Sequence, residues 1–368
     1  MEQRDRIGFS HSAQLDGLRC IAIMMVLVAH WAQWKIETPF LSSFPFSHGV
    51  TLFFVLSGFL ITRILLSGRE AYETGGLNTT GLFKAFYTRR FLRIFPLYYL
   101  LIFGLFIIDY QNCRDIFLWL VTYTTNIYQA VYRTYIGDFN HFWSLAAEEQ
   151  FYLLWPIVMV FTPKRNLRTV IFSMIFVSVI FRIWIFLTSA NWMAMVYSTP
   201  GCMQSLGFGA LAAYLFVYDK EALERLASKR NVLVFTAIYL IAFMLSDTLG
   251  PYWYKDVFDE VFFAFVAMSA VALAATKGFS GLVKIFLENS LVILTGRISY
   301  GIYVFHLFIP TFTYWLLPQI GIEVNDERIL FLMFLSITWL TAWLSWKFFE
   351  GPINRFKSRA PYLRASGG

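Results

Sequence analysis

Residues 15–31 read LDGLRCIAIMMVLVAHW, and this stretch indicates the fold class. Ten consecutive apolar residues, 20–29, separate Arg19 from His30, which is typical of a helix in a membrane or a large core. The spacing covers about three helical turns, so both side chains lie on one face, roughly 16 Å apart along the axis. An ionisable residue inside a membrane span is a candidate for function. The alternative for His30 is a structural hydrogen bond to a neighbouring helix.

The composition of the whole chain is also that of a membrane protein. Of the 368 residues, 58% are hydrophobic and 14% are charged, whereas a soluble domain has about 25% charged residues. The sequence therefore predicts an all-α, polytopic integral membrane protein. A β-barrel is excluded because its strands alternate in polarity over about ten residues and lack long unbroken apolar runs. The three cysteines are scattered and predict neither a disulfide framework nor a metal site.

We predict about ten membrane-spanning helices. They cover 18–34, 49–67, 91–109, 149–163, 167–187, 200–217, 231–247, 257–276, 298–317 and 329–349. If the further segment 115–131 does not cross the membrane, 24 of the 30 Lys and Arg residues lie on one side. The positive-inside rule makes that side the cytoplasm, with 115–131 as a re-entrant or surface segment on the outer side.

This topology places both termini in the cytoplasm. The predicted organisation is a cytoplasmic tail, 1–13, a membrane domain, 14–352, and a basic cytoplasmic tail, 353–368. Because the positive charge follows the orientation rule, the net charge of +7 indicates contact with membrane lipids and not with nucleic acid.

Further ionisable residues fall inside or beside the spans. His306 follows Arg297 by nine residues in GRISYGIYVFHLF, and is either part of a polar cavity or a hydrogen-bonded packing residue. In HFWSLAAEEQFYLLWP, Ser144 is a candidate helix cap, with Glu148 and Glu149 in the first turns of the span near the positive end of its dipole.

Two glutamates at the mouth of a span, beside His141, are also typical of a site. Arg182, in the outer half of the fifth span, is the expected charge partner of Glu148 or Glu149. These residues thus suggest a second group of polar side chains in the outer half of the membrane.

An arginine cluster lies on the cytoplasmic side, in FYTRRFLRIFPLYY. Arg89, Arg90 and Arg93 are either a topology signal that binds lipid phosphates or a docking patch for a phosphorylated substrate, because guanidinium groups bind phosphate with two donors. In the second span, GVTLFFVLSGFLI, Ser57 and Gly58 allow close helix packing or leave room for an acyl chain. The sequence has no zinc motif, P-loop or nucleophile elbow.

Six of these strings, in their order along the chain, resemble the acyltransferase-3 family of bacterial membrane acyltransferases. The first string is LDGLR, followed at residues 29–30 by AH. The others are GVTLFFVLSGFLI, RRFLRIFPLYY, WSLAAEEQFYLLWP, GRISYGIYVFHLFI and FFEGP, and the resemblance covers residues 14–352. The family's Arg–His motif falls on Arg19 and His30, and its glutamate block on Glu148 and Glu149. One departure is Thr51, where many relatives have an acidic residue. The chain resembles the stand-alone form, without a C-terminal esterase-like domain.

The resemblance implies transfer of an acyl group, most often acetyl, from cytoplasmic acetyl-CoA or another acyl-CoA to a hydroxyl of an extracytoplasmic glycan or glycolipid, in a bacterial inner membrane. A hydroxyl attacking a thioester needs a general base, and neutral imidazole is well suited. We therefore expect His30 to be the base and Glu148 to orient it or the acceptor hydroxyl. The donor is expected to bind to arginines: Arg19, Arg89, Arg90 and Arg93. The residues expected to contact the acceptor or to support the catalytic residues are Glu149, Arg182, Ser57, His306 and His141. Direct transfer and an acyl-histidine relay are both compatible with these residues, and no metal is expected.

Two other classes of function are compatible with buried charges. A transporter or flippase would use them as a permeation or proton path, although such proteins often contain inverted repeats and paired broken helices, which the sequence does not clearly show. A receptor or scaffold without catalysis would leave Arg19 and His30 without a role. Acceptor-dependent release of coenzyme A distinguishes an enzyme from both, and the oligomeric state is not predicted.

Overall fold

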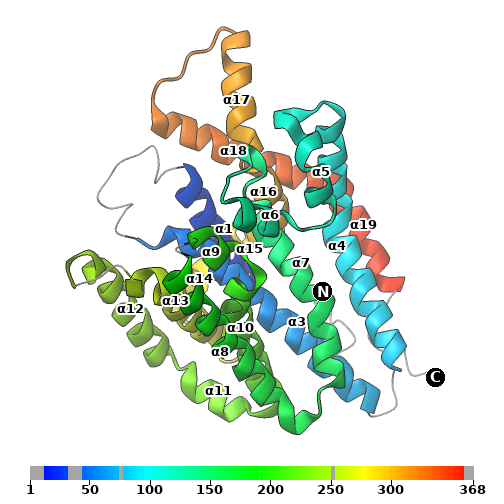
Figure 1. The fold of residues 1–368 in the computed structure, drawn as a ribbon, viewed down its shortest axis with the longest axis vertical. Helices are drawn as coiled ribbons and strands as arrows, with labels where there is room; N and C mark the ends of the chain where they lie inside the picture. Colours follow the sequence, from blue (N-terminus) through cyan, green and yellow to red (C-terminus); the bar gives the residue numbers. More distant parts are fainter. Residues whose placement is uncertain (1–11, 32–43, 74–77, 190, 250–252, 360–368) are drawn as a thin grey trace.

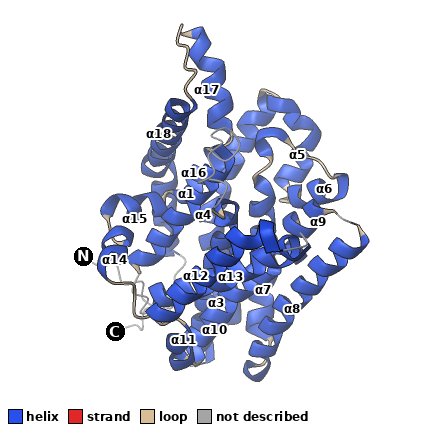
Figure 2. Cartoon of the chain, turned by 90° about the vertical axis from the view of Figure 1, so that its left-hand side faces the viewer, coloured by secondary structure: helices blue, strands red, loops and turns tan. Residues whose placement is uncertain are grey.

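The structure is a computed structural model that describes residues 12–31, 44–73, 78–189, 191–249 and 253–359. All regular elements in these ranges are helices (Figure 2), which confirms the predicted all-α class. The longer helices are α1 (Ala13–Trp31), α3 (Gly49–Glu73), α4 (Thr79–Ile107), α7 (Phe142–Phe161), α8 (Lys164–Thr188), α10 (Thr199–Tyr218), α12 (Lys229–Leu249), α13 (Trp253–Ala275) and α18 (Glu327–Ser345). The shorter ones are α5 (Cys113–Val121), α6 (Thr125–Tyr132), α9 (Trp192–Tyr197), α11 (Lys220–Leu226), α14 (Gly281–Leu287), α15 (Ser290–Arg297), α16 (Ser299–Phe305), α17 (Phe308–Gln319) and α19 (Gly351–Arg355).

Helix α3 occupies the middle of the bundle and packs against α10, α1, α13, α7 and α4 (Figure 1). Its closest neighbour is α10, and glycines allow the approach. A Cβ atom added at Gly58 would lie 2.1 Å from the Leu206 carbonyl oxygen, and one added at Gly209 would lie 2.1 Å from that of Val55. Of the two roles expected for the small residues of this span, Gly58 therefore has the packing role.

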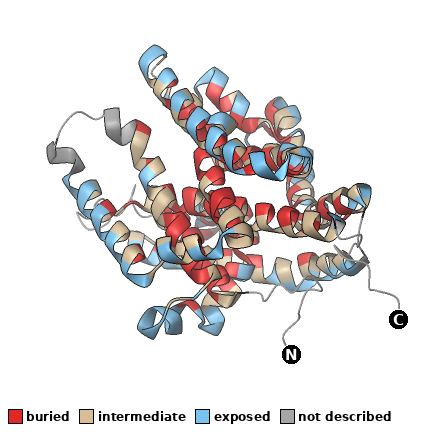
Figure 3. Cartoon of the chain, turned by 90° about the horizontal axis from the view of Figure 1, so that it is seen from below, coloured by how far each residue is buried: buried red, intermediate tan, exposed pale blue. Residues whose placement is uncertain are grey.

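Buried residues gather along the middle of the bundle, and the outer helices carry many exposed positions (Figure 3). Several of the exposed side chains are large and apolar, such as Leu154, Phe176, Leu187 and Ile238, each at least 60% exposed. A soluble protein rarely exposes so much contiguous apolar surface. This pattern fits helices that face lipid.

Within the described residues, seven helices are long and apolar enough to cross a membrane, or up to nine if each of two bent pairs counts as one span. The bent pairs are α11 with α12, at 49°, and α16 with α17, at 58°. Helix α7 is not among the seven, and it carries the consecutive polar residues Glu148, Glu149 and Gln150. The count of ten spans and the cytoplasmic termini remain predictions.

Two predicted segments differ in detail from the structure. Segment 115–131 forms two short helices, α5 and α6, of nine and eight residues, and neither is long enough to span a membrane. Helix α7 begins at Phe142, not at 149, so Glu148 and Glu149 lie well inside it and not at its mouth. The predicted cap was also wrong, because the Ser144 hydroxyl is inside the helix and contacts the His141 carbonyl and the Tyr303 hydroxyl.

Candidate active site

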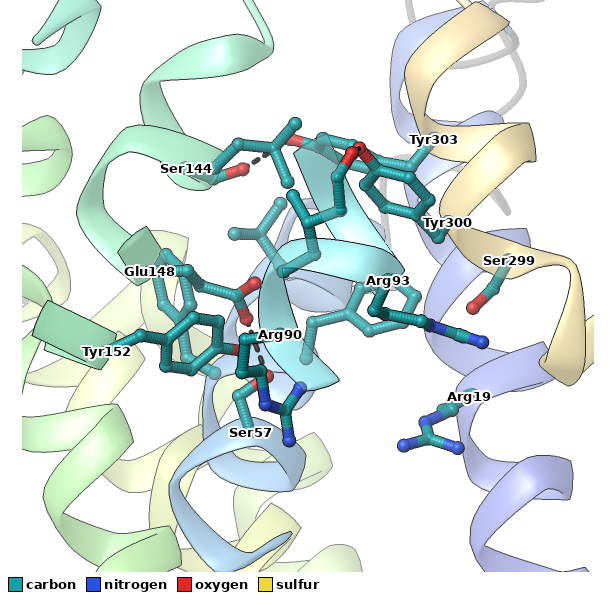
Figure 4. A pocket seen from close by; sticks show the side chains of 15 residues that line it. Arg19, Ser57, Arg90, Arg93, Ser144, Glu148, Tyr152, Ser299, Tyr300 and Tyr303 are labelled. Carbon is teal, nitrogen blue, oxygen red and sulfur yellow. Dashed lines mark hydrogen bonds between the residues drawn. The ribbon is translucent and has the colours of Figure 1, made fainter. Parts of the chain in front are cut away.

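A pocket of about 110 Å³ lies between α1, α3, α4, α7 and α16 (Figure 4). It brings together five of the predicted site residues: Arg19, Ser57, Arg90, Arg93 and Glu148. The other lining residues are mainly aromatic, aliphatic and hydroxyl-bearing: Val50, Phe53, Phe54, Ile94, Ser144, Leu145, Tyr152, Ser299, Tyr300 and Tyr303. The pocket therefore joins residues that are separated by up to 284 positions in the chain.

The guanidinium groups lie toward one end of the pocket (Figure 4). Arg19 Nη1 donates to Asp16 Oδ1 over 2.8 Å, and the same buried carboxylate accepts from Arg297 Nε over 3.1 Å. Asp16 precedes Arg19 by three residues on α1, so the helix itself places the pair together. Two cations thus share one carboxylate.

Arg90 and Arg93 are held mainly by aromatic rings and carbonyls. Arg90 lies 5.1 Å from the centre of the Tyr152 ring, and Arg93 lies 5.4 Å from that of Trp346. Arg93 Nη2 also donates to the Arg297 carbonyl over 3.3 Å. Among the described residues, neither arginine forms an ion pair with a carboxylate. This end of the pocket therefore has an excess of positive charge that suits an anion.

Glu148 provides the acidic group of the pocket. Its Oε1 accepts a hydrogen bond of 2.6 Å from Ser57 Oγ, which joins α7 to α3. Glu149 is the next residue on the helix and does not line the pocket, because consecutive side chains point about 100° apart. Only one of the two glutamates thus belongs to this site.

The opposite end of the pocket is formed by Ser144 and Tyr303 (Figure 4). Their hydroxyl groups lie 2.6 Å apart, and the Tyr303 hydroxyl donates to the His141 carbonyl over 2.8 Å. The Tyr303 ring is also in contact with the His306 ring, with their centres 5.2 Å apart. Tyr303 therefore lies between the pocket and His306.

Beyond Tyr303, three histidines from distant parts of the chain pack against one another. His30 Nδ1 and His306 Nε2 are 3.1 Å apart, and the His141 and His306 rings are 4.8 Å apart in an edge-to-face arrangement. His306 and His141 are buried, at 0% and 1% exposed. Within the described residues, no group of three or more His, Cys, Asp or Glu side chains could hold a metal ion. The cluster therefore consists of packed imidazole rings, two of which lie within hydrogen-bond distance of each other.

Two of the expected site residues lie elsewhere. The charge partner of Arg182 is Glu260 on α13, at 2.6 Å in a buried ion pair, so the expected pairing with Glu148 or Glu149 was wrong. Glu260 also accepts from the Thr51 hydroxyl over 3.2 Å. Arg89 does not line the pocket, and its Nη1 donates to the Lys357 carbonyl over 3.3 Å.

The sequence contains local signals for some site residues that were not predicted. Tyr303 precedes His306 by three residues, so the two share a helix face. Asp16 is related to Arg19 in the same way. Glu260, next to Asp259, is a carboxylate inside a predicted span, and a buried carboxylate there indicates a polar or cationic partner. The contact of Tyr303 with Ser144 depends on tertiary packing and has no local signal.

These observations describe a helical membrane protein with an arginine-rich pocket that ends at Tyr303, whose ring is in contact with the histidine cluster. The profile of a family described as an acyltransferase domain matches residues 12–349. The chain belongs to that family, as the sequence motifs indicated.

Relatives of this chain include O-acetyltransferases of Staphylococcus aureus. The chain is 30% identical over 369 residues to the O-acetyltransferase OatA of Staphylococcus aureus strain NCTC 8325, with 93% of this chain and 57% of OatA covered. The values for OatA of strain COL are the same. The chain thus spans somewhat more than half the length of these relatives. No solved structure matches it.

Proposed function

We propose that the protein is a membrane O-acyltransferase that moves an acetyl group from acetyl-CoA, bound from the cytoplasm, to a hydroxyl of an extracytoplasmic glycan or glycolipid. The observation that carries this proposal is the pocket, with arginines at one end and the histidine cluster behind the other. The acyltransferase family and the similarity to OatA support the reaction class. The cytoplasmic side is supported by the positive-inside rule, because Arg19, Arg90 and Arg93 belong to the basic segments.

The donor is suited to this pocket by charge and shape. Coenzyme A carries phosphates at one end and its thioester at the end of a slender arm. The phosphates would bind Arg19, Arg90 and Arg93, whose planar groups offer paired donors. The arm would follow the pocket past Ser57 and Glu148 toward Tyr303, which would bring the thioester close to the histidine cluster.

His30 would act as the general base in direct transfer. Its imidazole takes the proton of the acceptor hydroxyl while the oxygen bonds to the thioester carbonyl carbon. The carbon–sulfur bond then breaks, and the imidazolium returns the proton to the sulfur of the leaving coenzyme A. Every proton and electron pair is thus accounted for without a metal.

Glu148 would hold the middle of the path. It is anchored by the Ser57 hydroxyl at 2.6 Å, so one carboxylate oxygen has a fixed position. The other oxygen is in a position to orient a polar group of either substrate. Glu149, Arg182, His306 and His141 would act indirectly, through the helices and side chains that they contact.

The experiment is an assay of coenzyme A release by purified protein in lipid nanodiscs. Acetyl-CoA is supplied with a panel of glycan and lipid-linked sugar acceptors, and acetylated product is measured alongside free coenzyme A. We expect release that depends on an acceptor and matches product one to one. In a parallel assay with the protein in sealed lipid vesicles, acceptor movement across the membrane without any coenzyme A release would instead show a transporter.

A further inference from the structure

The backbone breaks at His306, between α16 and α17, with a bend of 58°. Pro310 lies four residues later and has no N–H group, so the His306 carbonyl cannot receive its helical hydrogen bond. The indole Nε1 of Trp31 donates to this carbonyl over 3.1 Å in a buried contact. Proline thus explains the break, and α1 supplies the missing donor.

The adjacent residue of α1 contacts the side chain of the same histidine. His30 Nδ1 lies 3.1 Å from His306 Nε2, while Trp31 holds the His306 backbone. Two successive residues of α1 therefore bind one residue at the break. Irregular backbone at membrane depth is stable only where its polar groups find partners of this kind.

The hydrogen bonds fix the proton positions on both rings. The Tyr303 carbonyl lies 2.7 Å from His306 Nδ1, and a carbonyl only accepts, so His306 Nδ1 carries a hydrogen. His306 is 0% exposed, and no carboxylate of the described residues pairs with it, so a second proton and its charge would be costly. Its Nε2 is therefore an acceptor, and the hydrogen shared with His30 lies on His30 Nδ1.

We infer that His306 is a positioning residue that holds His30 in the Nδ1–H form, so that His30 Nε2 is the atom that takes the acceptor proton. This inference rests on the proposed function. Which ring nitrogen of a histidine carries the proton is set by the partner of the other nitrogen. In this protein that partner is a neutral imidazole and not a carboxylate.

A neutral partner determines where the proton goes. When His30 Nε2 has accepted the hydroxyl proton, a transfer from His30 Nδ1 to His306 Nε2 would reach a ring whose other nitrogen faces only the Tyr303 carbonyl. A carbonyl does not take the proton further. The proton therefore returns from His30 Nε2 to the sulfur of coenzyme A, and the histidine pair is not an exit path.

A pair of substitutions separates the two hydrogen bonds of His306. In His306→Gln, the longer side chain can place an amide oxygen near the former Nε2 and accept from His30. In His306→Asn, the shorter side chain reaches the Tyr303 carbonyl but not His30. We expect His306→Asn to lower kcat on the order of 10- to 100-fold at unchanged donor KM. We expect His306→Gln to restore most of kcat, with similar melting temperatures for both proteins.

A third variant tests the inference if neither His306 variant folds. Trp31→Phe keeps an aromatic ring but removes the donor to the His306 carbonyl, and we expect a smaller fall in kcat at unchanged donor KM. A wild-type kcat in His306→Asn would overturn the positioning role. If the His306 variants do not fold, a wild-type kcat in Trp31→Phe would overturn it. His30→Ala is assayed in parallel. If it is inactive while His306→Asn is fully active, only this inference fails, whereas an active His30→Ala enzyme contradicts the proposed base itself.

Discussion

At the scale of single residues, the two positions that open the sequence argument remain central. Arg19 lines the pocket, and His30 belongs to the histidine cluster behind it. Their common helix face was predictable because it depends only on spacing. Of their partners, Asp16 has a sequence signal because it precedes Arg19 by three residues on α1. His306 was harder to predict, since its contact with His30 joins residues 276 positions apart.

The role of Arg19 is tested by Arg19→Lys. Lysine keeps the charge and can pair with Asp16, but it loses the planar fork that binds a phosphate with two donors. We expect donor KM to rise about tenfold with a smaller change in kcat, since a hydrogen bond to a charged group contributes about 1.5–3 kcal/mol. Arg89→Lys, outside the pocket lining, is the matched control and should change KM little. Equal KM values for Arg19→Lys and wild type would make Arg19 a topology signal only.

At the scale of helices, hydrophobic pattern predicted where most elements lie, and local chemistry decided where they end. Helix α7 begins earlier than predicted. The apolar residues Phe142, Trp143 and Leu145 extend the helix in the N-terminal direction, so Ser144, the expected cap, lies inside it. The break at His306 has a sequence signal in Pro310, four residues on. The close crossing of α3 and α10 depends on both helices and is not readable from either one alone.

That crossing predicts a selective effect of adding one methyl group. In Gly58→Ala the new Cβ would meet the Leu206 carbonyl oxygen at 2.1 Å, so α3 and α10 must separate. We expect destabilisation by about 1–3 kcal/mol, the usual cost of overpacking. The control is Gly104→Ala on α4, where a Cβ meets nothing within 4 Å. Thermal unfolding in detergent measures both, and equal melting temperatures would contradict the close packing.

The ion pair between Arg182 and Glu260 predicts a structural effect. Arg182 is 1% exposed and also donates to the carbonyls of Val257, Met195 and Gly201. Glu260→Gln leaves a buried cation without its carboxylate, and we expect a loss of about 3–5 kcal/mol. The double variant Arg182→Met, Glu260→Leu should recover part of this loss. Unfolding curves that place the double variant below Glu260→Gln would refute the pairing as the cause.

At the scale of the whole molecule, charge distribution gives the orientation that the helices alone do not. Impermeant maleimide labelling of Arg133→Cys and Arg165→Cys in intact cells tests it, since both positions are exposed and lie on opposite predicted sides. Native Cys20, Cys113 and Cys202 are buried and should stay unlabelled. We expect labelling at 133 and not at 165. The reverse pattern would place the arginine pocket outside and remove the basis for a cytoplasmic donor.

We propose above all that His30, behind the pocket, is the general base in the transfer of an acyl group from coenzyme A. Its most direct test is acceptor-dependent coenzyme A release by His30→Ala, measured together with acetyl-CoA binding at matched amounts of folded protein. Loss of a general base lowers a rate by about 10²- to 10⁴-fold, so we predict a fall of that size with donor binding unchanged. Turnover near that of wild type in a folded, donor-binding His30→Ala protein would contradict the account.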